Sequence, residues 1–361
     1  MEECDVLICG AGPSGTYLGK LCSEKGLRVK IIDSRQEIGI PLYSGELIDL
    51  NLLKGILPVT DDQLNFHPVG DVEYYLTDPG VSRKPIRFIQ EKEKSSGTVD
   101  RERLDKEMAA MAALSGVDIG IRSSISEISR TKDGVIAGIA RDGKILKILC
   151  RTIVRADGPD LTETKQPANA EAVSGRIFSN AVRSSSISLG IHSKKPFTMD
   201  LEKGEGFRNI VLLGGGTTEM IDLYSGWLSM HRFYFRQIYP AEPYASGVIN
   251  IGSRCIGPEP FFLSGIKDSL ETSRYALTCI LQFTEGIEEE KAASLFTESV
   301  RNHSAYIQKS IELLNLLKNL TPEGIGDLQT YLSQFEIQGI GWDHLLRQTG
   351  LSMEEIRKDF H

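Results

Sequence analysis

The chain has 361 residues, of which 40% are hydrophobic and 25% charged, and its formal net charge is −8 at pH 7. Such a chain is long enough to bury a large core, and its acidic balance argues against a nucleic-acid-binding protein. The six cysteines form no Cys-x-x-Cys pair and the six histidines show no metal-binding spacing, so we expect reduced thiols and no bound metal.

The first predicted elements form a β-α-β unit. A short apolar strand over 5–9 runs into Gly10-Ala11-Gly12-Pro13-Ser14-Gly15, a helix is predicted over 16–25, and a second strand over 27–32 ends at Asp33. A strand, a glycine-rich turn, a helix, a strand and an acid in this order form the dinucleotide-binding fingerprint. The sequence therefore predicts a dinucleotide site near residue 10.

Each residue type in this turn has a physical task. Gly10 permits the tight turn, Gly12 lets backbone N–H groups approach a pyrophosphate, and Gly15 lets the helix pack on the sheet. The partial positive charge of the helix N-terminus attracts phosphates, and Asp33, 18 residues after Gly15, stands close to where a ribose-binding acid is expected. The cofactor-binding residues predicted from this unit are Gly10, Gly12, Pro13, Ser14, Gly15, Asp33, Ser34 and Arg35.

Beyond this unit, loops, helices and strands follow one another. The segment 38–43 is predicted as an extended loop, 46–57 as a helix, and 99–114 as a second helix with Asp100 as its N-cap. The Asp142-Gly143 pair predicts a hairpin turn. Short strands are predicted at 117–121, 125–131, 135–141, 144–150 and 152–156.

The second half of the chain gives fewer signals, and the stretch 165–250 is the least readable. The elements predicted there and beyond are strands at 233–235 and 248–252, helices at 266–283 and 289–317, and shorter helices to residue 360. We find no internal repeat and no long linker. Because residues 2, 3 and 5 are acidic and no run approaches the ~18 apolar residues of a membrane span, we expect neither a secretory signal nor a transmembrane helix.

Three further stretches carry a resemblance to known flavoproteins. The strand over 152–156 ends in Asp157-Gly158, the sequence Val99-Asp100-Arg101 opens a helix, and Pro260 and Gly265 follow Gly252 at distances of 8 and 13 residues. With the first fingerprint, this combination resembles the flavoproteins of the p-hydroxybenzoate-hydroxylase fold, over roughly residues 1–160 and 248–285. The resemblance implies a bound FAD that is held, in addition, by Arg101, Asp157, Gly158, Ser253, Pro260, Gly265 and Ile266.

The helix predicted after Gly265 has a physical part in this expectation. Its N–H groups would point at the N1 and C2=O edge of the flavin, where the reduced flavin is anionic, and a helix N-terminus stabilises that charge. The alternative is that Gly265 only starts a packed helix.

Within this group of flavoproteins, the loop Ile40-Pro41-Leu42-Tyr43-Ser44-Gly45-Glu46 is most similar to the geranylgeranyl reductase family. The resemblance implies that Tyr43 and Ser44 face the isoalloxazine and act in catalysis, and that Gly45 and Glu46 contact the substrate. Four aromatic residues suit an apolar substrate pocket, although packing within a strand is the commoner role for such side chains. They are Trp227, Phe233, Phe235 and Tyr239.

The chain departs from the pattern of the family at several positions. Ser253 stands where the family has an acid, and Ser44 stands where the reductase loop often has a cysteine. Leu161 and Thr164 replace the Ser and Arg of the hydroxylases, which weakens the hydroxylase interpretation.

The spacing leaves two questions open. The 94 residues between Gly158 and Gly252 are few for a full substrate-binding sheet. A second alignment, which matches Phe235 to Pro240 with an aromatic strand of the reductases, assigns Gly252 to a different strand. We prefer the first alignment because the positions of Pro260 and Gly265 support it.

The predicted fold is α/β, with a Rossmann-like FAD-binding domain, an inserted β-rich substrate domain and a helical C-terminal region. The FAD-binding domain comprises residues 1–165 and 248–285, with interleaved substrate-side segments at about 41–97. The substrate domain covers 166–247 and the helical region 286–361.

The leading hypothesis that the resemblance implies is FAD-dependent reduction of carbon–carbon double bonds in an isoprenoid or similar apolar substrate. Reduced flavin would transfer hydride, and NAD(P)H or ferredoxin would donate the electrons. Two alternatives remain: a flavin-dependent monooxygenase, and a degenerate member that serves as a partner subunit or binding protein without catalysis. We expect a cytoplasmic protein with an apolar or lipid substrate, a protein electron donor if the donor is ferredoxin, and peripheral contact with a membrane.

Overall fold

The computed structural model describes most of the chain. The described residues are 1–40, 47–58, 60–69, 71–76, 84–89, 96–132, 134–158, 161–162, 170–178, 186–190, 197–202, 207–213, 221, 226–235, 241–257, 259, 261, 265–339 and 341–360.

The first sheet is the scaffold of the predicted dinucleotide site. Its main path runs β18-β19-β11-β1-β2-β8, and the pairs from β19 to β8 are parallel. The antiparallel strands β9 and β10 extend from β11 as a meander. The strands are β1 (Glu2–Cys9), β2 (Val29–Ile32), β8 (Asp118–Gly120), β9 (Ser123–Thr131), β10 (Gly134–Arg141), β11 (Lys144–Arg155), β18 (Tyr244–Ala245) and β19 (Val248–Asn250).

Helices cover one face of this sheet and the meander covers the other. The alternation along β1 separates the two cores: Val6 and Ile8 pack under α1 (Pro13–Glu24), α5 (Ile266–Thr284) and α6 (Glu289–Lys318), whereas Leu7 packs with the meander. All six cysteines are free and buried. Cys9 packs in the core shared with the meander, and Cys22 packs in the core under the helices.

The second sheet has the order β12-β17-β13-β16-β15-β14-β5-β6-β20 within the described residues. Most of its strands come from 161–235, but β5 and β6 come from the segment before α3, and β20 comes from the C-terminal region. The strands are β5 (Asp71–Tyr75), β6 (Ile86–Ile89), β12 (Leu161–Thr162), β13 (Ala170–Phe178), β14 (Ser186–Gly190), β15 (Phe197–Glu202), β16 (Phe207–Leu213), β17 (Trp227–Phe235) and β20 (Glu336–Gln338).

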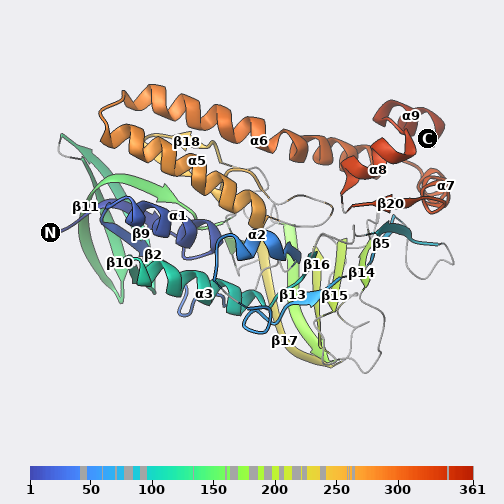
Figure 1. The fold of residues 1–361 in the computed structure, drawn as a ribbon, viewed down its shortest axis with the longest axis horizontal. Coiled ribbons are helices and arrows are strands. Elements are labelled where there is room, and N and C mark those ends of the chain that lie inside the picture. Colours follow the sequence, from blue (N-terminus) through green and yellow to red (C-terminus); the bar gives the residue numbers. More distant parts are fainter. Residues whose placement is uncertain are drawn as a thin grey trace.

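The long helix α6 joins the two halves of the molecule. In Figure 1 the first sheet and α1 lie at the end that carries the N-terminus, the second sheet and the last helices lie at the other end, and α6 runs between them. Its first half packs into the core of the first sheet through Phe296 and Val300, and its second half packs beside the second sheet through Leu313 and Leu317. The last helices are α7 (Pro322–Leu332), α8 (Trp342–Thr349) and α9 (Met353–Asp359).

An aromatic cluster fastens the C-terminal helices to the second sheet. Tyr74 and Phe88 from β5 and β6, Phe261 from the segment before α5, and Trp342 from α8 are all buried. The Phe261 and Trp342 ring centroids are 4.6 Å apart, and those of Tyr74 and Trp342 are 5.4 Å apart in an edge-to-face arrangement. The C-terminal region therefore shares one hydrophobic core with the second sheet.

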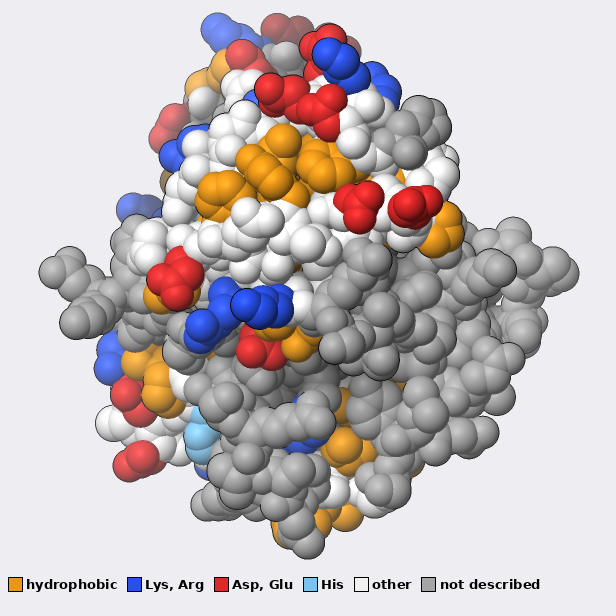
Figure 2. Space-filling model, turned by 90° about the vertical axis from the view of Figure 1, so that its right-hand side faces the viewer, with side chains coloured by type: hydrophobic (Ala, Val, Ile, Leu, Met, Phe, Trp, Pro, Cys, Tyr) orange, Lys and Arg blue, Asp and Glu red, His pale blue; other side chains and the backbone are white. Residues whose placement is uncertain are grey.

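The end of the molecule that carries these helices also presents apolar surface. The rings of Tyr331, Phe335 and Phe360 remain partly exposed, and the Tyr331 and Phe335 centroids are 5.2 Å apart. Figure 2 faces this end and shows a group of hydrophobic side chains bordered by acidic and basic ones.

Several local predictions can be compared with the structure. Helix α3 (Arg101–Leu114) is capped by Asp100, which accepts hydrogen bonds from the N–H groups of Glu102 and Arg103. The Asp142-Gly143 hairpin joins β10 and β11, and both residues have positive φ. These predictions and the predicted fold class are confirmed.

The helix predicted over 46–57 is only partly correct. A short strand β3 (Leu47–Asp49) precedes the helix α2 (Leu50–Lys54), because Leu47 to Asp49 pair with β7 (Ser96–Thr98). Strand β4 (His67–Pro68) joins the same small sheet. A pairing with a strand some 50 residues away cannot be read from local periodicity.

No helix in the described part of the chain is long and apolar enough to cross a membrane. This agrees with the absence of a long apolar run in the sequence.

Candidate functional site

The glycine turn between β1 and α1 has the geometry that the fingerprint predicts. Gly10 has a φ of 111°, and a Cβ atom at this position would lie 2.4 Å from the carbonyl oxygen of Ala156. A Cβ at Gly15 would lie 1.9 Å from the carbonyl oxygen of Gly10. Both positions therefore exclude a side chain, and Gly15 packs α1 against the turn itself.

Gly12 has a different environment. A Cβ at this position would meet no atom of the described residues within 4 Å. Gly12 is the N-cap of α1, Pro13 follows as the first residue of the helix, and no described side chain caps this end. The first turn of α1 thus offers uncapped backbone N–H groups beside open space, which is the arrangement that binds a phosphate.

Asp33, at the end of β2, is buried and fully engaged with its surroundings. The N–H of Ala11 donates to its Oδ2 at 2.7 Å, and the Nε and Nη2 atoms of Arg35 donate to Oδ1 and Oδ2 at 2.9 and 2.8 Å. Burial on its own raises the pKa of this carboxyl, but the Arg35 charge and these hydrogen bonds outweigh burial and hold the pKa below its ordinary value. Asp33 therefore ties the glycine turn to β2, with Ser34 exposed beside it.

A second close contact brings the start of α5 against this turn. Gly252, with a φ of 64°, opens the short helix η1 (Gly252–Arg254), and its N–H donates to Thr272 Oγ1 at 2.9 Å. A Cβ at Gly252 would lie 2.6 Å from Ser14 Oγ and 3.2 Å from Ser269 Oγ. Ser273 Oγ donates to the carbonyl oxygen of Ser14 at 2.9 Å. The first turns of α1 and α5 are therefore packed together around a single glycine.

The helix predicted after Gly265 is present. Gly265 is the N-cap of α5, Ile266 is its first residue and is buried, and no described side chain caps this helix. Ser253 lies half-buried on η1 beside this end. Pro260 lies outside the described residues.

Asp157 follows β11 and is held by two arginines. Arg155 Nε donates to Asp157 Oδ2 at 2.9 Å, and Arg254 Nη1 lies 3.3 Å from Oδ1. This group of three charges has a net positive charge, and it stands next to Ser253, where the resemblance leads one to expect a carboxylate. Gly158 has a φ of 71°, and a Cβ there would meet no atom of the described residues within 4 Å.

Neither of these arginines is among the site residues predicted from the sequence. Arg155 lies two residues before Asp157 at the end of a strand, and that spacing places both side chains on one face, so a local signal was present. Arg254 reaches Asp157 from η1, and only the tertiary structure reveals that contact.

The start of α3 links the first fingerprint to the second sheet. Arg101 Nε lies 2.7 Å from Oδ1 of Asp105, one turn along the helix. The N-cap Asp100 also meets Arg176 of β13, whose Nη2 lies 3.5 Å from Asp100 Oδ2, and Arg176 Nε donates to Asn209 Oδ1 at 3.2 Å. A polar contact thus joins the predicted cofactor side to the predicted substrate side.

The predicted substrate residues are described only in part. Trp227 lies half-buried among Val173, Ile177, Ile210 and Leu212, and its Nε1 donates to the carbonyl oxygen of Ile221 at 3.4 Å. Since Ile210 follows Asn209 directly on β16, this cluster lies on the sheet face opposite to the Arg176 contact.

Phe233 and Phe235 belong to β17 and pair in register with Ala172 and Ala170. The other predicted residues of this group lie outside the described part of the chain; they are Tyr43, Ser44, Gly45, Glu46 and Tyr239. The catalytic, cofactor and substrate roles given to all these residues remain predictions.

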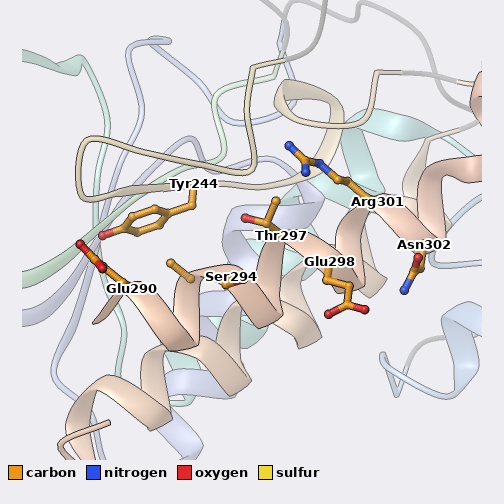
Figure 3. Close-up of a pocket in the computed structure, with 8 residues that line it drawn as sticks. Tyr244, Glu290, Ser294, Thr297, Glu298, Arg301 and Asn302 are labelled. Atoms are coloured by element: carbon orange, nitrogen blue, oxygen red, sulfur yellow. The ribbon is translucent and has the colours of Figure 1, made fainter. Parts of the chain in front are cut away.

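A separate pocket lies along α6. It has a volume of about 450 Å³, and none of the predicted site residues lines it. Figure 3 shows Tyr244 lying across from the α6 residues Glu290, Ser294 and Thr297, with Arg301 further along the helix. Most of the residues that line it are polar or charged, and Ala293 is the exception.

Taken as a site, the described residues fit the ADP half of FAD. Gly10 and Gly15 leave no room for a side chain, and a Cβ at Gly12 would meet no described atom beside the first N–H groups of α1. At the end of β2, Asp33 accepts a hydrogen bond from the N–H of Ala11. The N-terminal part of α5, which no described side chain caps, packs against the start of α1 through the hydrogen bond from Ser273 to Ser14. The fold and this cradle define a Rossmann-type dinucleotide-binding architecture with an added β-rich sheet.

Comparisons with known proteins agree with this class. No family model matches the chain. A digeranylgeranylglycerophospholipid reductase of Thermoplasma volcanium is 32% identical over 165 residues, which is 44% of this chain and 40% of that protein. Digeranylgeranylglycerophospholipid reductase 1 of Methanothermobacter thermautotrophicus is 27% identical over 291 residues, which is 75% of this chain and 69% of that protein. The match to the first relative thus spans less than half of its length.

Solved structures show the same fold over nearly the whole chain. A geranylgeranyl bacteriochlorophyll reductase-like protein of Thermoplasma acidophilum has a TM-score of 0.84 at 19% identity, with 99% of this chain and 98% of that chain covered. A flavin-dependent halogenase, CmlS, has a TM-score of 0.67 at 14% identity, with 99% and 72% covered. The resemblance seen in the sequence is confirmed: the chain is similar in sequence to digeranylgeranylglycerophospholipid reductases, and its fold is that of a geranylgeranyl bacteriochlorophyll reductase-like protein.

Proposed function

We propose that this protein is an FAD-dependent oxidoreductase that reduces carbon–carbon double bonds of an isoprenoid or similar apolar substrate. The observation that carries the proposal is the cradle formed by Gly10, Gly12 and Gly15 at the uncapped end of α1, in a chain whose relatives are named as reductases of a prenyl lipid. FAD would supply hydride from its reduced flavin ring.

The residues of the cradle have separate tasks in this proposal. The first turn of α1 binds the pyrophosphate through its N–H groups, and Gly12 keeps the approach open. Asp33 fixes the shape of the turn and stands at the ribose side. The N-terminus of α5 stabilises negative charge on the flavin ring, because its partial positive charge is uncapped.

The substrate side of the proposal rests on the second sheet. Its strand β17 carries the predicted substrate residues Trp227, Phe233 and Phe235. Tyr43 and Ser44 are proposed to face the reacting centre from the loop before β3, with Gly45, Glu46 and the aromatic residues of β17 on the substrate. A side chain or a water molecule would supply the proton that completes the reduction.

The proposal also covers the electron donor and the place of the protein in the cell. NAD(P)H or a ferredoxin would reduce the flavin, and with ferredoxin the protein would have a protein partner. We propose a cytoplasmic protein that meets its lipid substrate at a membrane surface.

The test is a reaction without oxygen. FAD-loaded protein is reduced with dithionite under nitrogen and mixed with a phospholipid that carries geranylgeranyl chains, and the absorbance of oxidised flavin is followed with the mass of the lipid. We expect the flavin to be reoxidised and the lipid to gain two hydrogen atoms for each flavin. The saturated phytanyl lipid is the matched control and should leave the flavin reduced.

Two other results would replace the proposal. Oxidation of NAD(P)H in air, stimulated by a substrate that becomes hydroxylated, would identify a monooxygenase. A protein that takes up no FAD would be a binding protein or partner subunit of the same fold.

A further inference from the structure

A buried carboxylate in the first turn of α5 has no part in the function proposed so far. Asp268 is 4% exposed, and both of its oxygens are occupied from α6: His303 Nε2 lies 2.8 Å from Oδ1, and the Tyr306 hydroxyl donates to Oδ2 at 2.7 Å. Asp268 therefore does not cap its own helix, although an acid at this position commonly does so.

This carboxylate lies at a junction of the fold. The next residue of α5 is Ser269, and a Cβ at Gly252 would lie 3.2 Å from its Oγ. The same turn of α5 therefore packs on the cradle. His303 and Tyr306 lie on α6 between Val300, which belongs to the core of the first sheet, and Leu313, which belongs to the core of the second. The cluster thus joins the cofactor end of α5 to the helix that connects the two cores.

Burial and the neighbouring Asp268 carboxylate raise the pKa of the Tyr306 hydroxyl, so it stays a neutral donor. Lys267 and Glu271 are the nearest charged residues along α5, and Glu271 is paired with Arg274 at 2.7 Å. A negative charge in the first turn of a helix offsets part of the positive potential at its N-terminus.

We propose that Asp268, held by His303 and Tyr306, is a positioning residue that lowers the reduction potential of the flavin at the N-terminus of α5. The inference rests on the proposed function. A double bond in a prenyl chain is not activated by a neighbouring carbonyl, so its reduction calls for a strongly reducing flavin. In the proposed site, a fixed carboxylate in the first turn of α5 would make the anionic reduced flavin less favourable and its hydride easier to transfer.

The experiment measures the midpoint potential of bound FAD in wild type and in the D268N variant, by titration against redox dyes under nitrogen. We expect the D268N potential to be more positive, with the ratio of reduced to oxidised flavin changed by about tenfold at a fixed ambient potential, or ~30 mV for this two-electron couple. E271Q, which neutralises an acid one turn further along the same helix, is the matched control and should shift the ratio by less than about twofold.

A second variant separates charge from packing. Y306F removes one hydrogen bond and keeps the carboxylate, so we expect its potential to move in the negative direction, opposite to that of D268N. If the cluster only holds α5 and α6 together, both variants lower the melting temperature and leave the potential of bound FAD within error of wild type, which would overturn the inference. Should D268N fail to fold, a shift in Y306F that is positive or absent would overturn it equally.

The outcomes for the inference and for the proposed function are distinct. Wild-type protein that binds FAD and reduces the prenyl lipid, with no shift in D268N, refutes only the inference. A shift in D268N in a protein that reduces no prenyl lipid refutes the substrate and leaves the role of Asp268 intact.

Discussion

Replacing Gly15 with alanine is expected to destabilise the protein by about 3 kcal/mol and to abolish FAD binding. A Cβ atom there would lie 1.9 Å from the carbonyl oxygen of Gly10, so the backbone of the turn must move, and inserted atoms in a close-packed site cost about 1–3 kcal/mol or more. The measurement is urea unfolding followed by circular dichroism, with FAD content determined on the same preparation.

Gly12→Ala is the matched control for this change. A Cβ at Gly12 meets no described atom within 4 Å, so the free energy of unfolding of the apoprotein should stay within about 0.5 kcal/mol of wild type. The same methyl group would occupy the space proposed for the pyrophosphate, so FAD affinity should fall at least about tenfold. Equal loss of stability in both variants, or full FAD affinity in G12A, would contradict the assignment of this cradle.

Replacing Trp342 with alanine is expected to cost about 3–5 kcal/mol of unfolding free energy, the usual range for a buried tryptophan. Its side chain is 3% exposed and packs against Tyr74 and Phe261, which come from two other parts of the chain. The substitution should therefore also weaken the packing of the second sheet and of the segment before α5. The measurement is denaturant unfolding monitored by far-UV circular dichroism.

The chain contains one other tryptophan, Trp227, which serves as the control. Trp227 is half-buried in a small cluster, so its replacement by alanine should cost less, about 1–2 kcal/mol. If W342A is no more destabilising than W227A, the C-terminal helices are not part of the core of the second sheet.

The cradle could be predicted from the sequence because its determinants are local. Gly10, Gly12, Gly15 and Asp33 lie within one β-α-β unit, and their spacing alone specifies the turn, the helix start and the acid. The cap at Asp100 and the hairpin at Asp142-Gly143 follow from neighbouring residues in the same way.

The second sheet could not be predicted because its order depends on distant pairings. The interval of 94 residues after Gly158 looked too short for a full sheet. The structure completes the sheet with β5 and β6 from residues 71–89, which join through a parallel pairing with β14, and with β20 near the C-terminus. Neither pairing leaves a signal in local periodicity.

The hydrogen-bond partners of Asp33 and Asp268 could not be predicted from the sequence, because these contacts also form only in the folded chain. Asp33 is predicted from the sequence as a ribose-binding acid. The hydrogen bonds that it accepts from Ala11 and Arg35 are seen only in the folded turn. Asp268 is 35 residues from His303 and 38 from Tyr306 in the sequence, and it meets them only because α5 and α6 pack side by side (Figure 1).

The most direct test of the account is the absorbance spectrum of freshly purified protein, with the supernatant after heat denaturation analysed for FAD. We expect the two visible-region bands of a bound flavin and close to one FAD per chain. A colourless protein that also takes up no added FAD would contradict the central claim, because the cradle at Gly10 to Gly15 would then serve a fold that has lost its cofactor.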